Sequence, residues 1–346
     1  MISRIIDEKA IDKVRQLLLE SEKIVITCHL TPDGDAIGSS LGLCHVLRSI
    51  GKDAVVVTPD LTPKSLQFLP GVNKTVAFTR QQELAAKLFA DADMIFCLDF
   101  NESPRVDLLE PVLLGSKAPK VMIDHHLHSG SFADVVISYP KVSSTAMLVF
   151  RVLCRLELFD RINREAAECI YTGMMTDTGN FSYNSNDPDL YVVIAELLKK
   201  GVDKDSLYQR ACNTFSESSL RLNGYALSEK MELLSEHKCS LIALNAAELA
   251  RFNYEKGDTE GLVNKPLAMP DVVWSVYLRE DPNQIKISMR SKGDFPVNAV
   301  CKDVFGGGGH LNAAGAEFKG TLVDCIKKLK NAMANYDNYL PKHQSK

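Results

Sequence analysis

The chain has 346 residues, of which 45% are hydrophobic and 24% charged, a composition typical of a globular protein long enough for two domains. Its formal net charge of −4 argues against a long nucleic-acid duplex as the principal partner, because a duplex is held by many phosphate contacts. The 9 cysteines are scattered and never form a Cys-x-x-Cys pair, which indicates buried thiols in a reducing compartment. We find neither a signal peptide nor a membrane-spanning segment and expect a cytoplasmic protein.

The first half of the chain alternates short apolar runs with helix-like stretches, the pattern of a parallel sheet covered on both faces. The predicted strands are 24–28, 54–57, 94–98 and 120–123, and the predicted connecting helices are 36–50 and 81–89. Helices over 145–156 and 164–172 follow, and then a glycine-bracketed turn over 173–181. We therefore predict an α/β fold with a parallel-sheet domain over residues 1–186.

The second half begins with helices and returns to strands. Helices over 190–200, 204–212 and 217–235 predict a helical linker over 187–236. Beyond it we expect strands at 239–244, 272–278, 285–289 and 316–318, with helices at 297–304 and 321–336. This pattern predicts a smaller α/β domain over residues 237–346.

Acidic and imidazole side chains gather where the predicted strands of the first domain end. These residues are His29, Asp33, Asp35, Asp99, Asp124, His125 and His126, and Asp177 joins them from the predicted turn. In open α/β sheets, ligands bind at the carboxyl ends of the strands, and Pro32 and Gly34 would supply a tight turn there. Any single aspartate could instead be a helix cap, but three strands that end in this way favour one common site.

Five carboxylates in one crevice would repel one another unless cations neutralise them, because none of these motifs contains lysine or arginine. The mixture of carboxylate and imidazole favours Mn²⁺ over Mg²⁺ or Fe²⁺. Strand alternation turns Cys28 and Cys97 away, so a thiolate zinc site is not expected. Eight candidate ligands are more than one ion needs, so we expect two ions about 3.5–4 Å apart. Because neighbouring side chains of an extended segment point in opposite directions, one of His125 and His126 would bind metal and the other would reach substrate.

The predicted second domain carries a candidate anion site. Four consecutive glycines, Gly306 to Gly309, precede His310, and backbone amides without Cβ atoms nearby can approach a phosphate. The alternative is a flexible surface loop. Arg290 ends a predicted strand, where its guanidinium could bind a phosphate through two hydrogen bonds, or could simply lie on the surface.

The assembled motifs resemble the DHH phosphoesterase family, which is named after the triplet Asp124-His125-His126. Within it the chain is most similar to the branch with a DHH-associated C-terminal domain, and there to small stand-alone oligoribonucleases (nanoRNases) and pAp phosphatases. The matching motifs occur in the family's order at 29–35, 99, 124–126, 173–179, 260–264, 288–293 and 306–315. An arginine common near Ser182 in the family is absent from this sequence.

The resemblance implies an active site in a cleft between the two domains, with roles for individual residues. His29, Asp33 and Asp99 would hold one Mn²⁺, and Asp35, Asp99, His125 and Asp177 would hold the other. Asp124 would orient the site from behind the ligands. Phosphate contacts would come from His126, Arg290, Gly307, Gly308, Gly309 and His310, and Arg105 would be a further partner of the substrate.

The function implied is a two-metal hydrolase in which a bridging hydroxide attacks the phosphoester in line. We expect it to cut very short single-stranded RNA to mononucleotides and to dephosphorylate pAp. The alternative substrates are linear or cyclic dinucleotides such as pApA and c-di-AMP. A non-enzymatic nucleotide-binding regulator is a third possibility, and a homodimer is a family-level expectation.

Overall fold

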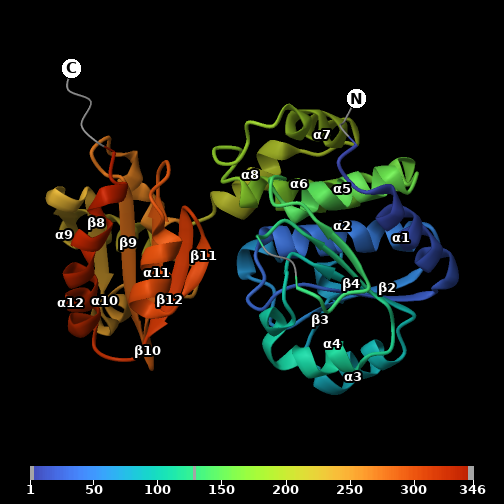
Figure 1. The fold of residues 1–346 in the computed structure, drawn as a ribbon, viewed down its shortest axis with the longest axis horizontal. Helices are drawn as coiled ribbons and strands as arrows, with labels where there is room; N and C mark the ends of the chain where they lie inside the picture. The colour runs from blue at the N-terminus through green and yellow to red at the C-terminus, as the bar shows by residue number, and fades with distance from the viewer. Residues whose placement is uncertain (1–3, 128–129, 342–346) are drawn as a thin grey trace. The chain divides into compact units, whose positions relative to one another are not determined.

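The computed structural model describes residues 4–127 and 130–341, and the chain divides into two compact units, 1–214 and 215–346 (Figure 1). The division falls inside the segment 187–236 that was expected as a linker. The helices α7 (Pro188–Lys199) and α8 (Lys204–Cys212) of that segment pack on α5 (Thr145–Arg155) and α6 (Arg164–Asp177) of the first unit. In contrast, α9 (Glu217–Glu229) packs on strands of the second unit. Each unit has its own hydrophobic core.

The first unit is built on a six-stranded sheet in which every neighbouring pair is parallel, with strand order β3-β2-β1-β4-β5-β6. Its strands are β1 (Lys23–Thr27), β2 (Asp53–Thr58), β3 (Val76–Ala77), β4 (Met94–Leu98), β5 (Lys120–Asp124) and β6 (Val135–Ser138). The four strands predicted from sequence are confirmed. The short strands β3 and β6, at the two edges of the sheet, were not predicted.

Helices cover both faces of this sheet (Figure 1). They are α1 (Glu8–Glu20), α2 (Gly34–Ser49), α3 (Gln82–Ala90), α4 (Glu110–Gly115), α5 (Thr145–Arg155), α6 (Arg164–Asp177), α7 (Pro188–Lys199) and α8 (Lys204–Cys212). Ile24, Ile26 and Phe96 face the core shared with α1, α2, α5 and α6. Alternate residues such as Val25 and Ile95 face the smaller core under α3 and α4. Burial on both faces explains why these strands are apolar throughout.

Two boundaries near the predicted site differ from expectation. Helix α6 continues to Asp177, so the prediction of a turn starting at Gly173 is wrong. Helix α2 begins at Gly34, which lies against the side chain of Thr176 and is needed for close packing rather than for a turn. In both places a glycine that was predicted to form a turn instead lets two helices approach each other closely.

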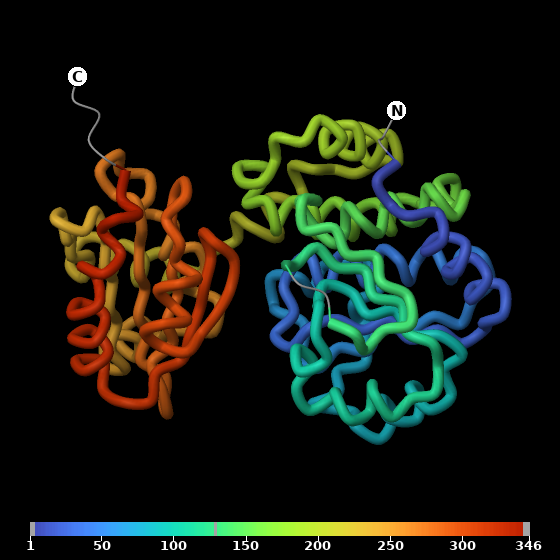
Figure 2. The backbone as a smooth tube through the Cα atoms, viewed as in Figure 1, coloured from blue at the N-terminus to red at the C-terminus, as the bar shows by residue number. Residues whose placement is uncertain are grey.

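The second unit contains a six-stranded mixed sheet with strand order β11-β12-β10-β9-β8-β7, and Figure 2 traces its chain. Its strands are β7 (Met231–Leu234), β8 (Cys239–Leu244), β9 (Trp274–Asp281), β10 (Gln284–Ser291), β11 (Gly308–His310) and β12 (Ala313–Phe318). Its helices are α9 (Glu217–Glu229), α10 (Ala246–Arg251), α11 (Val297–Phe305) and α12 (Leu322–Ala332). The predicted helix 217–235 is too long, because its last turn is β7. Residues 308–310 form an edge strand, so the flexible-loop alternative is wrong for that part of the glycine run.

One face of this second sheet is only partly covered. Helices α9 and α10 pack over β8 and β9 on that face, and α11 and α12 pack on the opposite face.

Among the residues that the structure describes, we find no helix that is both long and apolar enough to cross a lipid bilayer.

Candidate metal centre

The segment after β1 contributes His29, Asp33 and Asp35. Asp33 is the N-cap of α2, and its Oδ1 accepts hydrogen bonds from the amides of Asp35 (3.0 Å) and Ala36 (3.1 Å). This cap fixes the first turn of α2 and keeps the Asp33 carboxylate at the end of the strand. His29 Nε2 lies 3.8 Å from Asp33 Oδ1, so the imidazole and the carboxylate face the same space.

Asp99 follows β4 and stands at the centre of the group. It is 2% exposed, and its backbone has a φ of 64°, a left-handed conformation that aspartate and asparagine tolerate better than most residues. Its Oδ2 lies 3.4 Å from His29 Nε2, and its Oδ1 lies 3.6 Å from His125 Nε2. The two oxygens of one carboxylate therefore face different histidines.

His125, which follows β5, faces Asp35 and Asp177. Its Nε2 lies 3.5 Å from Asp177 Oδ2 and 3.9 Å from Asp35 Oδ2. The atoms form three sets, in each of which every ligand atom lies within 4.8 Å of the others. The sets are His29 with Asp33 and Asp99, Asp35 with His125 and Asp177, and Asp99 with His125 and His126. The structure thus brings together all seven of these predicted residues from the ends of β1, β4, β5 and α6.

The histidine tautomers fit metal binding. His29 Nδ1 lies 2.8 Å from the carbonyl oxygen of Leu30, and His125 Nδ1 lies 3.2 Å from that of Val142. A carbonyl only accepts hydrogen bonds, so each Nδ1 carries a proton and each Nε2 faces the carboxylates, where it could bind a cation once it has no proton of its own. An imidazole and carboxylate donor set of this kind suits Mn²⁺, Fe²⁺ or Zn²⁺.

Asp124 supports His126 rather than a histidine of the expected ligand set. Its Oδ1 lies 2.7 Å from His126 Nδ1, and its Oδ2 accepts a hydrogen bond from the His126 amide at 2.9 Å. Asp124 is fully buried, so this pair holds the His126 ring in one orientation. The sequence predicted a supporting role for Asp124, but its partner is visible only in the fold.

The electrostatics of the protein groups alone show how strongly the centre attracts positive charge. Burial lowers the pKa of His29, but Asp33 and Asp99 raise it by more, to about 10. Burial raises the pKa of Asp99, but His29, His125 and His126 together hold it well below its usual range. Burial raises the pKa of Asp177 to about 7. Without metal, the centre therefore retains protons on groups that would bind a cation.

These pKa values predict that metal binding depends on pH. A metal at His29 must displace the proton that this imidazole keeps up to about pH 10. Below about pH 7 a metal must also displace a proton from Asp177. We expect Mn²⁺ affinity to rise about tenfold per pH unit from pH 7 to 9, and more steeply below pH 7. Calorimetric titration in buffers of different ionisation enthalpy measures the protons released, and affinity independent of pH would contradict the assignment.

Arg105 belongs to a 3-10 helix, η3 (Ser103–Leu109), next to the centre. Its carbonyl accepts a hydrogen bond from the Leu30 amide at 2.8 Å and so fixes the loop after His29. Burial lowers the pKa of His126, whereas Asp124 and Asp99 together raise it above its ordinary value. The charge of Arg105 opposes that rise. The charge of Arg105 therefore acts on His126, and a contact of Arg105 with substrate stays a prediction.

The remaining predicted residues belong to the second unit, where Arg290, Gly308 and His310 share one face of the sheet. Gly309 alternates to the other face, and Gly307 precedes the strand. Arg290 and His310 are both paired with Ala313, one from β10 and the other from β11. Residues paired directly across strands point to the same face, so the two side chains flank Ala313 with their Cα atoms about 10 Å apart. Gly308 and Gly315 form the next row of this face. A Cβ added at Gly308 would meet nothing within 4 Å, so the backbone of this row is open beside Arg290 and His310.

Two features of the centre were missed by sequence reasoning. Gly34, Gly38 and Gly42 are spaced four residues apart on α2 and lie against α6, where a Cβ at Gly38 would be 2.5 Å from the Cys169 carbonyl oxygen. This spacing is a signal that the sequence contains. Thr145 begins the helix predicted over 145–156, and its hydroxyl donates to Asp99 Oδ1 at 2.9 Å. No local pattern indicates that contact.

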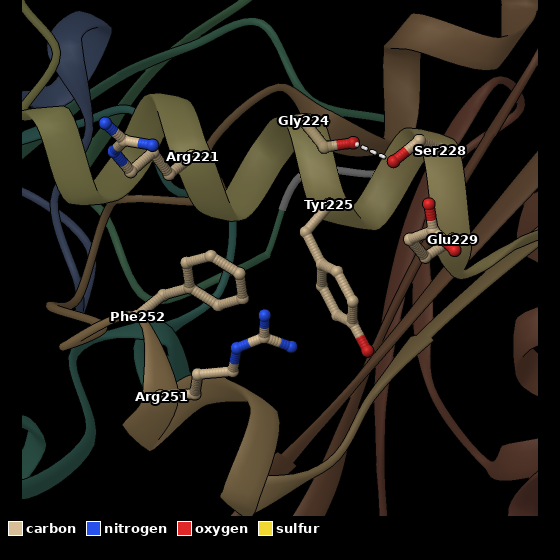
Figure 3. A pocket seen from close by; sticks show the side chains of 7 residues that line it. All are labelled: Arg221, Gly224, Tyr225, Ser228, Glu229, Arg251 and Phe252. Carbon is tan, nitrogen blue, oxygen red and sulfur yellow. Dashed lines mark hydrogen bonds between the residues drawn. The ribbon is translucent and has the colours of Figure 1, made fainter.

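A separate hollow lies between α9 and α10 of the second unit (Figure 3). The Arg251 guanidinium lies over the rings of Tyr225 and Phe252, at 5.4 and 5.1 Å from their centroids. None of the residues predicted to form the site lines this hollow.

Comparisons with known proteins agree with this geometry. Residues 23–174 match the DHH family, N-terminal domain, and residues 241–339 match the DHHA1 domain. The bifunctional oligoribonuclease and PAP phosphatase NrnA of Thermus thermophilus is 33% identical over 87% of this chain and 86% of its own. The chain belongs to the DHH phosphoesterase family. It is therefore a hydrolase, which disfavours the non-enzymatic alternative.

Two further relatives extend the comparison. A crystal structure of an exopolyphosphatase-related protein from Bacteroides fragilis has a TM-score of 0.96 and 47% identity, and the match covers 98% of this chain and 99% of that one. The cyclic-di-AMP phosphodiesterase GdpP of Bacillus subtilis is 26% identical over 93% of this chain but only 49% of its own. This DHH protein thus resembles relatives whose names refer to different phosphate substrates.

Proposed function

We propose that this DHH protein is a Mn²⁺-dependent phosphoesterase that cuts very short RNA to mononucleotides and removes one phosphate from pAp. The observation that carries the proposal is the placement of Asp99, whose two carboxylate oxygens face the His29 and His125 sides of one buried group. The relatives named NrnA, which are called oligoribonucleases and PAP phosphatases, support this substrate class.

Two of the donor sets would each suit one cation. His29, Asp33 and Asp99 would hold one, and Asp35, His125 and Asp177 would hold the other with Asp99 shared between them. Divalent cations at such a site activate water for attack and offset the charge of the phosphate oxygens. The chain's own contribution is to bind and orient the phosphate, and the His126 ring, held by Asp124, is suited to donate a hydrogen bond to it.

The second unit would hold the end of the substrate. Arg290 and His310 lie beside the glycine row of Gly308 and Gly315, and a guanidinium together with open backbone suits a terminal phosphate. We propose that this surface and the metal centre act on one substrate, as the family resemblance implies. A short, end-bound ligand also fits the net charge of −4, which offers a long polymer little attraction.

Gly308 tests the role of this surface. A Cβ added at Gly308 meets nothing within 4 Å, whereas one at Gly307 would lie 2.3 Å from the Gly315 carbonyl oxygen. Gly308→Ala should therefore fold normally but raise KM about tenfold, because the methyl group would occupy the position of the substrate phosphate. Gly307→Ala should lower the melting temperature instead. An unchanged KM in Gly308→Ala would remove this surface from the proposal.

The second candidate is hydrolysis of linear or cyclic dinucleotides, which the similarity to GdpP supports. Product analysis with Mn²⁺ separates the candidates when pAp, pApA, c-di-AMP, a dinucleotide, a trinucleotide and a long oligomer are compared at equal concentration. We expect mononucleotides from the short RNAs and phosphate from pAp at higher kcat/KM than from the other substrates. A strong preference for pApA or c-di-AMP would favour the second candidate.

A further inference from the structure

Thr145 donates hydrogen bonds to two carboxylates of the metal centre. It is the first residue of α5 and is fully buried. Its amide donates to Asp35 Oδ2 at 2.6 Å, and its hydroxyl donates to Asp99 Oδ1 at 2.9 Å. The next amide, that of Ala146, donates to Asp35 Oδ1 at 2.8 Å. Both oxygens of Asp35 are therefore held by the N-terminus of α5, and one oxygen of Asp99 is held by the first side chain of that helix.

Asp35 and Asp99 belong to different sides of the centre. Asp35 forms a set with His125 and Asp177, whereas Asp99 also forms a set with His29 and Asp33. A residue that bonds to both carboxylates fixes the distance between the two sets. A displacement of Asp99 on one side would be transmitted to Asp35 through Thr145.

The Thr145 hydroxyl is not needed to cap the helix. The N-cap is Ser144, whose Oγ accepts a hydrogen bond from the Met147 amide at 3.1 Å. A threonine hydroxyl in a helix commonly donates to a carbonyl of the preceding turn, but this one donates to a buried carboxylate. Hydrogen bonds to an ionised acceptor are roughly twice as strong as neutral ones, so the contact restrains Asp99 strongly.

We infer that Thr145 is a positioning residue that holds the carboxylates of Asp35 and Asp99 at a fixed separation and couples the binding of the two cations. The inference rests on the proposed metal-dependent function. It predicts that loss of the hydroxyl weakens the binding of the second ion more than that of the first. Residues that support metal ligands in this way typically contribute 10- to 100-fold in metal affinity.

The test compares Thr145→Val, Thr145→Ser and Thr145→Ala in the full-length protein. Valine keeps the shape without the hydroxyl, and the serine and alanine variants differ from each other only in the hydroxyl. Thr172→Val is the matched control, because Thr172 is also fully buried but its hydroxyl bonds the Glu168 carbonyl on α6. Electron paramagnetic resonance of Mn²⁺ titrations reports free ions and spin-coupled pairs, and circular dichroism reports folding.

In the wild type and in Thr145→Ser we expect two Mn²⁺ ions and the signal of a coupled pair. Thr145→Val and Thr145→Ala should bind the second ion about 10- to 100-fold more weakly and lose most of that signal, while Thr172→Val should match the wild type. Wild-type affinity in Thr145→Val, equal loss in the serine and alanine variants, or the same loss in Thr172→Val would each overturn the inference. If Thr145→Val does not fold, the serine and alanine pair decides. A wild type without a Mn²⁺ pair would overturn the proposed function itself, and Thr145 would then have no pair to position.

Discussion

Asp99→Asn should eliminate detectable turnover of dinucleotides and pAp. Asparagine keeps the shape of the side chain and tolerates the left-handed backbone at this position, where φ is 64°. It removes the negative charge that faces His29 on one side and His125 on the other. Since residues that merely support metal ligands contribute up to about 100-fold in affinity, loss of the shared carboxylate should cost more than about 100-fold for Mn²⁺. Steady-state kinetics and Mn²⁺ titration measure both effects.

Asp107→Asn is the matched control for this prediction. Asp107 is an exposed aspartate with a φ of 48°, and it belongs to none of the three ligand sets. It undergoes the same chemical change at a residue whose φ is also positive, and it should retain wild-type activity and metal binding. Retention of Mn²⁺-dependent turnover by Asp99→Asn would refute the two-ion mechanism.

Gly38→Ala should destabilise the first unit and weaken its metal centre together. A Cβ at this position would lie 2.5 Å from the Cys169 carbonyl oxygen and 2.7 Å from the Gly173 amide nitrogen. These are backbone atoms of α6, so the contact can be relieved only if α2 and α6 move apart. We expect the free energy of unfolding to fall by about 1–3 kcal/mol. Because α2 carries Asp35 and α6 carries Asp177, Mn²⁺ affinity should fall as well.

Gly224→Ala separates this packing effect from the general effect of alanine in a helix. Gly224 lies inside α9, and a Cβ there meets nothing within 4 Å. The change should stabilise the protein by up to about 1 kcal/mol through helix propensity and leave Mn²⁺ affinity unchanged. Thermal unfolding and Mn²⁺ titration of both variants provide the comparison. Equal stability of Gly38→Ala and the wild type would show that the helices do not depend on this contact.

The parts of the fold that local pattern determines were predicted well. Strand 94–98 and helix 204–212 have the expected bounds, because a continuous apolar run and a helical period are properties of the segment alone. The strand-end acids and histidines were also found from sequence, because parallel strands bring their carboxyl ends to one edge.

The errors arose where tertiary contacts override local signals. Gly173 was predicted to open a turn, but it lies inside α6. A glycine is needed there because a Cβ would be 2.7 Å from that of Ala146. The glycine run forms part of β11 because Gly307 and Gly309 lie against the backbone of β12, where a side chain would not fit. The contacts of Thr145 with Asp35 and Asp99 span 110 and 46 residues of sequence. Such long-range contacts depend on the whole fold and leave no local pattern in the sequence.

A pair of divalent ions should hold together the acids and histidines at the ends of β1, β4, β5 and α6. Anomalous diffraction at the manganese absorption edge, from crystals grown with Mn²⁺, tests it most directly. We predict two peaks about 3.5–4 Å apart, one beside His29 and Asp33, the other beside His125 and Asp177, and both in contact with Asp99. A single peak away from Asp99, or no peak among these side chains, would contradict the account.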